Sequence, residues 1–325
     1  MTDDDVLDAH PLLFLVGTTA SGKSRLGLEL AERLDAEIVS LDSMSVYRGM
    51  DVGTAKPSPA ERERVPHHLI DVADPRDTFD LQAYLGLVRD ALRGIHARGR
   101  RALFVGGTGL YLAALLRGLF DGPETDPRVR ARVEASGTTE ELWKRLEEVD
   151  PESAARIHPN DRRRTVRALE VFEQTGERLS ELQARAKEAR WEDGAGAREQ
   201  RARVLGIRWP VDELDERIRA RTRAMLEARW ADEALALAAA GGLGKSAGQA
   251  LGYREALALG RGEIGFEEAV EVIALRTRQF ARRQRTWFRR FEVRWVEGEA
   301  GLDGMVGVGV SVLGGGEGEE ARART

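Results

Sequence analysis

The stretch LLFLVGTTASGKSRLGLEL, residues 12–30, contains the segment that decides the fold. GTTASGKS at 17–24 is a full match to the phosphate-binding pattern G-x-x-x-x-G-K-[ST]. The apolar run at 11–16 predicts a buried strand before it, and 23–34 predict a helix after it. In that context the loop amides can surround a phosphate, Lys23 supplies a positive charge, and the Ser24 hydroxyl can bind Mg²⁺. The motif alone leaves open an ATPase, a kinase or an enzyme that releases diphosphate.

Strands and helices are expected to alternate on both sides of this loop. Further strands are predicted at 36–41, 101–105 and 204–209, and helices at 79–97, 110–116, 211–240 and 267–291. This order predicts an α/β fold with a P-loop NTPase-like, doubly wound parallel sheet. Ligands of such sheets bind at the carboxyl ends of the strands. Gly17, Asp42 and Thr108 each follow a predicted strand, so we expect them to converge on one site.

The middle of the chain has no strand signal and is charged, helical and rich in arginine. We therefore predict a discontinuous core at 8–120 and 201–297, interrupted by a helical insertion at 121–200 whose last ten residues form a loop. The remaining segment, 298–325, is rich in glycine, and we expect it to be disordered or loosely attached.

Composition restricts the chemistry. The chain has no cysteine, which excludes disulfides, thiolate zinc sites and cysteine nucleophiles, and fits a reducing interior. No apolar run reaches the roughly 18 residues that span a bilayer. The acidic start of the chain differs from a basic secretory signal. We expect a cytoplasmic protein without a membrane partner.

The net charge of -5 hides a basic segment at 276–294, which holds eight arginines and one acid, Glu292. Helical spacing predicts an inward stripe of Ile273, Thr277, Phe280, Gln284, Trp287 and Phe291. Arg278, Arg282, Arg285 and Arg289 then lie on nearly the opposite side. A run of charges is usually a solvated face, but uncompensated arginines repel one another. A polyanionic partner explains this face better.

The sequence lacks the usual partner of a phosphate loop in nucleotide hydrolases, a strand ending in a Mg²⁺-binding aspartate. The strand at 101–105 ends in Gly-Gly-Thr, and Asp71 is a weak substitute. Asp42 is the sharper acid, because it follows a strand that must end near the loop. It could bind metal, act as a base, or cap the next helix.

Five motifs in this order resemble those of the tRNA dimethylallyltransferases, the bacterial tRNA isopentenyl transferases of the IPP transferase family. They are GTTASGKS at 17–24, LDSMSVYRGMDVGTAKPS at 41–58, HHLIDVADP at 67–75, VGGTGLYLAALLRGL at 105–119 and IHPNDRRRTVRALEVFEQTG at 157–176. The resemblance covers about 11–296. It implies transfer of a dimethylallyl group from dimethylallyl diphosphate to N6 of adenosine 37, in the anticodon stem-loop of tRNA, by a monomer.

The resemblance also implies roles for particular residues. Asp42 is the general base, and Lys23, Arg221, the loop amides and Mg²⁺ on Ser24 neutralise the leaving diphosphate. Thr108 contacts the target nucleotide, which enters a channel after leaving its stack. The implied diphosphate site is Gly17, Thr18, Thr19, Ala20, Ser21, Gly22, Lys23 and Ser24. The implied tRNA contacts are Asp42, Ser43, Met44, Ser45, Thr108, Arg130, Arg163, Arg164, Arg167, Arg278, Arg282 and Arg285.

The chain departs from the family pattern at two positions of the site. Thr18 stands where the family usually has proline, and Ser45 where it often has the glutamine that contacts the flipped adenine. Three alternatives remain: a P-loop kinase, which would turn over ATP; an RNA-binding NTPase, which would leave the RNA unchanged; and an adenylate isopentenyltransferase, which would modify free AMP. The helical insertion and the basic helix favour a tRNA substrate over free AMP.

Overall fold

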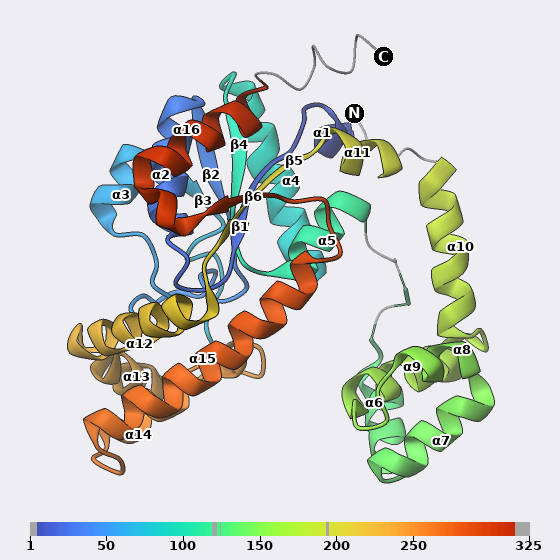
Figure 1. Ribbon diagram of the computed structural model, residues 1–325. Helices are drawn as coiled ribbons and strands as arrows, with labels where there is room; N and C mark the ends of the chain where they lie inside the picture. The colour runs from blue at the N-terminus through green and yellow to red at the C-terminus, as the bar shows by residue number, and fades with distance from the viewer. Residues whose placement is uncertain (1–4, 119–121, 124, 193–194, 316–325) are drawn as a thin grey trace. The chain divides into compact units, whose positions relative to one another are not determined.

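The computed structural model describes residues 5–118, 122–123, 125–192 and 195–315. These form two compact units, one made of 1–115 with 201–325 and the other of 116–200 (Figure 1). The first contains the sheet and the phosphate loop, and the second is helical. The predicted α/β class with a parallel sheet is confirmed.

A six-stranded sheet forms the centre of the first unit, with the order β3-β2-β4-β1-β5-β6 and every neighbouring pair parallel. Its strands are β1 Leu13–Gly17, β2 Ala36–Leu41, β3 His67–His68, β4 Arg101–Gly106, β5 Arg203–Arg208 and β6 Arg294–Glu297. Leu41 pairs with Gly106, Val16 also pairs with Gly106, and Gly17 pairs with Ile207. This register brings the carboxyl ends of β2, β4, β1 and β5 to one edge.

Helices cover both faces of the sheet. Leu13 and Leu15 share a buried cluster with α2 and α16, while Phe14, which points to the other face, stacks on Phe104. The helices of this unit are α1 Asp5–Asp8, α2 Lys23–Arg33, α3 Pro59–Arg64, α4 Leu81–Ala97, α5 Gly109–Arg117, α12 Val211–Glu227, α13 Trp230–Ala239, α14 Tyr253–Gly260, α15 Phe266–Phe288 and α16 Gly301–Gly314, with short 3-10 turns η1 Ala247–Gln249 and η2 Gly298–Ala300. None of the helices in the described residues could cross a membrane.

The second unit has its own apolar core, to which Val133, Leu142, Leu146, Val166 and Leu169 contribute. Its helices are α6 Pro127–Ala135, α7 Thr139–Val149, α8 Pro151–Arg156, α9 Arg162–Thr175, α10 Leu179–Glu192 and α11 Ala195–Arg201. Capping explains several starts: Asp126, Thr138, Asp150 and Asp161 each accept a bond from a first-turn amide. Helix α11 corrects the expected loop at 191–200.

The expected disorder of 298–325 is wrong for the part that the structure describes. Residues 301–314 form helix α16, on which Met305, Val306 and Leu313 are buried. Its glycines permit close packing: a Cβ on Gly309 would lie 2.6 Å from Leu30 and 3.2 Å from Leu205. The apolar residues spaced between the glycines therefore form a core-facing stripe, which the glycine content concealed. Residues 316–325 lie outside the described residues.

Two other predictions about the helices need correction. The helix expected at 211–240 is broken at Arg229, whose φ of 69° is left-handed and ends the helical path. On α15, Phe280 is 37% exposed instead of buried. Ala281 lies inward in its place, in a cluster with Leu214 and Ile218 of α12, because a small residue lets the two helices approach closely.

Replacing Leu313 with alanine tests whether α16 belongs to the core. Leu313 is fully buried, so Leu313→Ala is expected to lower the free energy of unfolding by roughly 2–5 kcal/mol. Val308→Ala, on the exposed side of the same helix, is the control and is expected to change it by less than about 1 kcal/mol. Urea denaturation measures both. Equal effects of the two substitutions would show that α16 does not pack as described.

Candidate active site

The phosphate loop leaves the end of β1 and turns directly into α2. The turn requires left-handed backbone at Ala20 and Gly22, with φ values of 63° and 91°. Glycine adopts that conformation at no steric cost, which explains Gly22. A Cβ on Gly17 would lie 2.8 Å from the Ser21 hydroxyl oxygen. The two glycines of the motif therefore have different roles. Gly17 leaves room for the Ser21 side chain, and Gly22 permits the left-handed backbone.

Side chains from the second half of the chain hold this loop. Trp209 Nε1 donates to the Ser21 carbonyl at 3.0 Å, and Arg217 Nε donates to the Ala20 carbonyl at 3.0 Å. The Arg217 guanidinium also lies over the Trp209 ring, 4.1 Å from its centre. The loop conformation is consequently fixed by the residue after β5 and by α12, as well as by its own sequence.

Two cations meet at the loop. Arg221 Nη1, on α12, donates to the Thr19 hydroxyl at 2.7 Å, and Lys23 Nζ donates to the Thr18 carbonyl at 3.3 Å. Burial and the charge of Arg221 lower the pKa of Lys23 to about 8, against an opposing effect of Asp42. Burial likewise lowers the pKa of Arg221, and Asp42 again opposes it. The three charges are thus close enough to influence one another. Neither cation forms an ion pair with a residue that the structure describes, which suits a site for an anionic ligand.

Gln284 also belongs to the candidate site. From the sequence, we expect it only to lie on the inward stripe of α15. Its Oε1 accepts from the Thr19 amide at 2.9 Å, and its Nε2 donates to the Gly107 carbonyl at 2.9 Å. The side chain is 5% exposed. It therefore connects the phosphate loop to the segment after β4. A buried glutamine in an otherwise apolar stripe was the available signal, because a buried amide needs polar partners.

Asp42 and Thr108 lie at the ends of the adjacent strands β2 and β4. Asp42 Oδ1 accepts from the Met44 amide at 2.8 Å and from the Ser45 amide at 3.3 Å, which caps the turn after β2. The Thr108 hydroxyl accepts from the Ser43 amide at 3.2 Å. Among the described residues, Asp42 Oδ2 has no hydrogen-bond partner. One oxygen of Asp42 thus holds the turn, and the other remains available for chemistry.

The polar groups of Ser45 and Asp71 bond to other residues and are not directed at this cluster. Ser45 is 6% exposed, and its hydroxyl lies 2.7 Å from that of Ser40, so its side chain points into the protein. Asp71, a weak candidate for binding metal, is instead paired with Lys56 at 2.6 Å and Arg62 at 2.7 Å. Groups of three or more acids or histidines that could hold a metal are absent from the described ranges. Ser24, the predicted Mg²⁺ ligand, is exposed.

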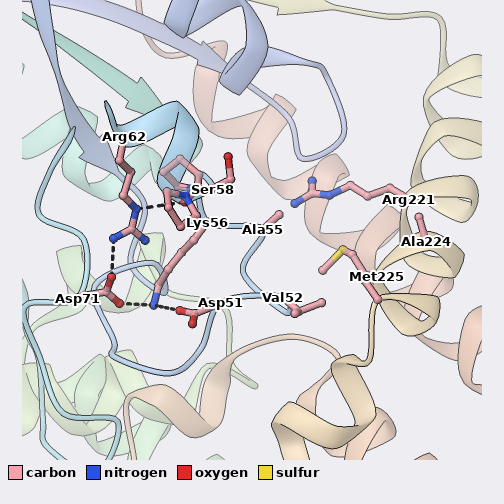
Figure 2. Close-up of a pocket in the computed structure, with 13 residues that line it drawn as sticks. Asp51, Val52, Ala55, Lys56, Ser58, Arg62, Asp71, Arg221, Ala224 and Met225 are labelled. Carbon is pink, nitrogen blue, oxygen red and sulfur yellow. Dashed lines mark hydrogen bonds and ion pairs between the residues drawn. The ribbon is translucent and has the colours of Figure 1, made fainter. Parts of the chain in front are cut away.

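A pocket of about 680 Å³ adjoins the cluster through Arg221 (Figure 2). One wall comes from 51–59, with Val52, Ala55 and Pro57, and the opposite wall from α12, with Ala224 and Met225. Its surface is mainly apolar, and the Arg221 guanidinium extends toward it between the two walls. An apolar pocket beside a cationic phosphate loop suits a ligand with an anionic head and a short hydrocarbon chain.

The predicted tRNA-binding arginines of the second unit divide into two kinds. Arg130 and Arg167 pair with the buried Glu170, at 3.4 and 3.3 Å, and therefore stabilise the unit internally. Arg163 and Arg164 are exposed on α9, where Arg164 has only a loose pair with Asp161 at 3.5 Å. The exposed pair is the better candidate for contacting an external anion.

On the basic face of α15, the arginines predicted to bind tRNA are not paired with any acid that the structure describes. Arg278, Arg282 and Arg285 have no ion pair to any residue in the described part of the chain, whereas Arg276 of the same helix pairs with Glu255 at 2.7 Å. Arg282 is exposed and the other two are half-buried. This agrees with the expectation of an external polyanion.

The chain is similar to known proteins over most of its length. The family model for IPP transferase matches residues 45–291. The chain belongs to the IPP transferase family. It is 44% identical over 295 residues to tRNA dimethylallyltransferase 2 of Geotalea uraniireducens, covering 89% of this chain and 93% of that protein. It is 45% identical over 302 residues to tRNA dimethylallyltransferase of Methylococcus capsulatus, covering 90% and 94%.

Solved structures of IPP transferases agree with this membership. The crystal structure of tRNA isopentenylpyrophosphate transferase from Bacillus halodurans is similar with a TM-score of 0.68 at 34% identity, covering 97% of this chain and 99% of that one. A eukaryotic dimethylallyltransferase, solved while acting on tRNA, is similar with a TM-score of 0.71 at 25% identity, covering 89% and 74%. The family inferred from the five motifs is therefore confirmed.

Gln284 offers a test of the link between α15 and the phosphate loop in this IPP transferase. Gln284→Leu removes both hydrogen bonds and leaves the Thr19 amide and the Gly107 carbonyl unsatisfied, which is expected to cost about 1–3 kcal/mol of unfolding free energy for each group. The binding of inorganic diphosphate, measured by calorimetry, is expected to weaken at least about tenfold. The matched control is Gln279→Leu, at an exposed position of the same helix. Unchanged diphosphate affinity in Gln284→Leu would contradict the assignment.

Proposed function

We propose that the chain transfers the dimethylallyl group of dimethylallyl diphosphate to N6 of adenosine 37 in the anticodon stem-loop of tRNA. The bond from the allylic carbon to the diphosphate oxygen breaks, a bond from that carbon to N6 forms, and N6 loses a proton. Because tRNA is the acceptor, the proposed compartment is the cytoplasm. The observation that carries the proposal is the convergence of Asp42, Thr108, Arg221 and the phosphate loop at one edge of the sheet.

Asp42 is the proposed general base. The lone pair of an exocyclic adenine amine is delocalised into the ring, so a base must take the N6 proton as the new bond forms. The Oδ2 oxygen has no partner in the described residues, while Oδ1 holds the carboxylate in place through two amides. Thr108, anchored to Ser43, lies at the next strand end and is the proposed contact to the target nucleotide.

Lys23, Arg221 and the loop amides are proposed to stabilise the leaving diphosphate. Negative charge increases on the diphosphate as its bond to carbon breaks, and fixed cations lower the energy of that state without reorganising. Arg221 is oriented by Thr19, which is itself part of the loop. Lys23 lies at the first residue of α2, where the helix dipole also favours an anion.

Mg²⁺ is the proposed cofactor, and the donor set fits it. Mg²⁺ prefers oxygen ligands, retains several waters, and is often held by one or two protein groups together with substrate phosphates. The Ser24 hydroxyl is exposed at the start of α2, beside the loop. Ser24 would hold the ion against the diphosphate, where the ion would supply additional positive charge.

A direct test uses unmodified tRNA, dimethylallyl diphosphate and Mg²⁺ without ATP, followed by mass spectrometry of the nucleosides. An adenosine heavier by one C5H8 unit supports the proposal. Unmodified tRNA together with ATP consumption in a parallel reaction would favour the RNA-binding NTPase, and modification of free AMP alone would favour the adenylate enzyme.

Asp42→Asn separates the base from the cap, since the amide oxygen can still accept from the Met44 and Ser45 amides. The rate of transfer at saturating substrates is expected to fall by about 10²–10⁴-fold, while the tRNA dissociation constant stays within about twofold, because the turn is retained. The control is Asp80→Asn, at another capping aspartate, whose Oδ1 accepts from the Ala83 amide. Transfer within a few-fold of the wild type, or an equal loss of tRNA binding, would contradict the role.

Replacing Arg278, Arg282 and Arg285 with glutamine tests the basic face of α15. Each lost phosphate contact removes one released counterion, so the slope of log affinity against log salt is expected to become shallower by about 2–3 and tRNA binding to weaken. Arg33, Arg100 and Arg101 provide a control with the same change in charge, near the opposite ends of the strands. Filter binding at several salt concentrations measures both. An unchanged slope in the α15 variant would refute the assignment.

A further inference from the structure

Residues 50–57, which we term the wall loop, form one side of the pocket beside Arg221. Asp51, Val52, Ala55, Lys56 and Pro57 of this loop line the pocket, opposite α12 (Figure 2). The pocket and the phosphate loop share Arg221, whose guanidinium binds Thr19. The position of the wall loop therefore determines the space beside the diphosphate site.

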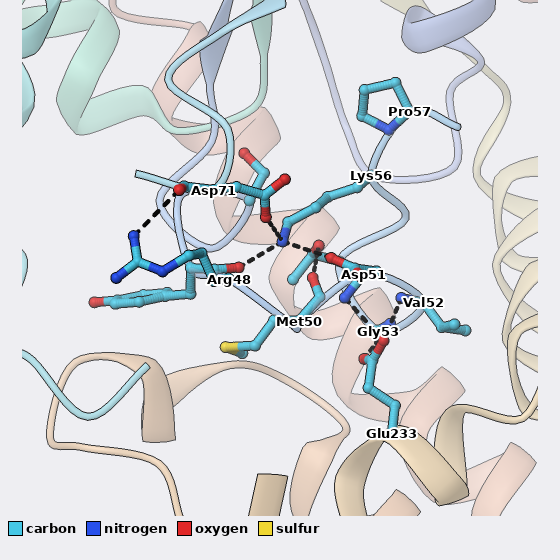
Figure 3. A network of polar contacts seen from close by, with 12 residues as sticks. Arg48, Met50, Asp51, Val52, Gly53, Lys56, Pro57, Asp71 and Glu233 are labelled. Atoms are coloured by element: carbon cyan, nitrogen blue, oxygen red, sulfur yellow. Dashed lines mark hydrogen bonds and ion pairs between the residues drawn. The ribbon is translucent and has the colours of Figure 1, made fainter. Parts of the chain in front are cut away.

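Glu233, on α13, holds the wall loop by its backbone (Figure 3). Its Oε2 accepts from the Asp51 amide at 2.8 Å and the Val52 amide at 2.7 Å, and its Oε1 accepts from the Gly53 amide at 3.1 Å. Three consecutive amides around one carboxylate form a concave anion site, and bonds to a charged acceptor are stronger than neutral ones. The carboxylate therefore supplies the polar attachment of this loop to α13.

Two aromatic residues complete the attachment. Tyr253 Oη donates to Glu233 Oε1 at 2.7 Å, and the buried Trp230 ring packs edge-to-face against Tyr253. A Cβ on Gly53 would lie 2.2 Å from Trp230 Nε1 and 2.5 Å from Tyr253 Cζ. The wall loop thus lies directly on these rings, and only glycine fits at the point of contact.

Lys56 stabilises the other end of the loop. Its ammonium, 1% exposed, donates to the Tyr47 carbonyl at 2.5 Å and pairs with Asp51 at 2.7 Å and Asp71 at 2.6 Å (Figure 3). The Asp51 contact closes the loop on itself, and the contacts to Tyr47 and Asp71 attach this end of the loop to neighbouring segments. Met50 and Val52 also pack in the apolar cluster that contains Trp230 and Tyr253. Among the described residues, Glu233 accepts the hydrogen bonds that join the backbone of 51–53 to α13, so loss of Glu233 would release that part of the loop while its other contacts remain.

We propose that Glu233 is a positioning residue for prenyl transfer, which sets the width of the pocket beside Arg221 by holding the wall loop against α13. This inference rests on the proposed function, because it treats the apolar walls as the surroundings of the five-carbon group. Glu233 lines neither the pocket nor the phosphate loop, and it acts through the loop backbone. A displacement of the wall loop by about 1 Å is enough to misalign a reacting carbon and cost up to about 10²-fold in rate.

The experiment compares Glu233→Ala and Glu233→Gln with Asp232→Ala, the control at the neighbouring residue, whose carboxylate pairs with Arg229. Steady-state kinetics with saturating tRNA give kcat and the KM for dimethylallyl diphosphate. In Glu233→Ala, KM is expected to rise and kcat to fall, lowering kcat/KM by about 10–100-fold while tRNA affinity is unchanged. Glu233→Gln is expected to recover part of the loss, because its amide oxygen can still accept from two of the three amides.

Hydrogen exchange distinguishes positioning from general stability. Faster exchange confined to the amides of 51–53, with the melting temperature near that of the control, is the expected result for Glu233→Ala. Loss of protection throughout the sheet, or normal kinetics despite faster exchange at 51–53, would overturn the proposal. If Glu233→Ala does not fold, Gly53→Ala displaces the loop while retaining Glu233 and is expected to raise KM similarly; an unchanged KM would overturn it. A wild-type protein without transfer activity would instead refute the proposed function.

Discussion

The candidate site depends on the backbone of one tight loop being held from outside. The phosphate loop contains two left-handed residues, Ala20 and Gly22, and alanine pays a steric cost in that conformation. Trp209, Arg217 and Gln284 bond to the loop backbone, and Arg221 bonds to its Thr19 hydroxyl. All four come from beyond residue 200. The motif specifies a shape, and the second half of the chain makes that shape the stable one.

The same external support orients the chemistry. Gln284 reaches Gly107 as well as Thr19, and Thr108 in turn reaches Ser43, beside Asp42. A continuous series of hydrogen bonds thus connects α15, the phosphate loop and the ends of β4 and β2. Because each of these hydrogen bonds is buried or partly buried, they hold the candidate base and the leaving-group site in a defined arrangement. Such preorganisation reduces the cost of aligning two substrates.

Sequence reasoning succeeded where one local rule decided the outcome. Strand ends at Gly17, Leu41 and Gly106 follow from short apolar runs bounded by turn residues, and parallel pairing then brings Asp42 and Thr108 together. It failed where contacts with residues distant in the sequence determine the structure. Ala281 replaces Phe280 on the inner face because α12 packs closely there, and α16 orders because Leu30 and Leu205 receive Gly309. Glu233 carries no motif, since its role exists only when 51–53 lies beside it.

The position of β1 in the sheet has a consequence for biosynthesis. β1 lies between β4 and β5, and β5 is encoded after the entire helical unit. A nascent chain can pair β1 with β4 early, but the other edge of β1 stays open until residues 203–208 leave the ribosome. At about 5–20 residues per second, an unpaired apolar strand edge would persist for several seconds at least. The helical unit, with its own core, can fold during that delay, so the order of synthesis matches the order in which each part becomes able to bury its apolar residues.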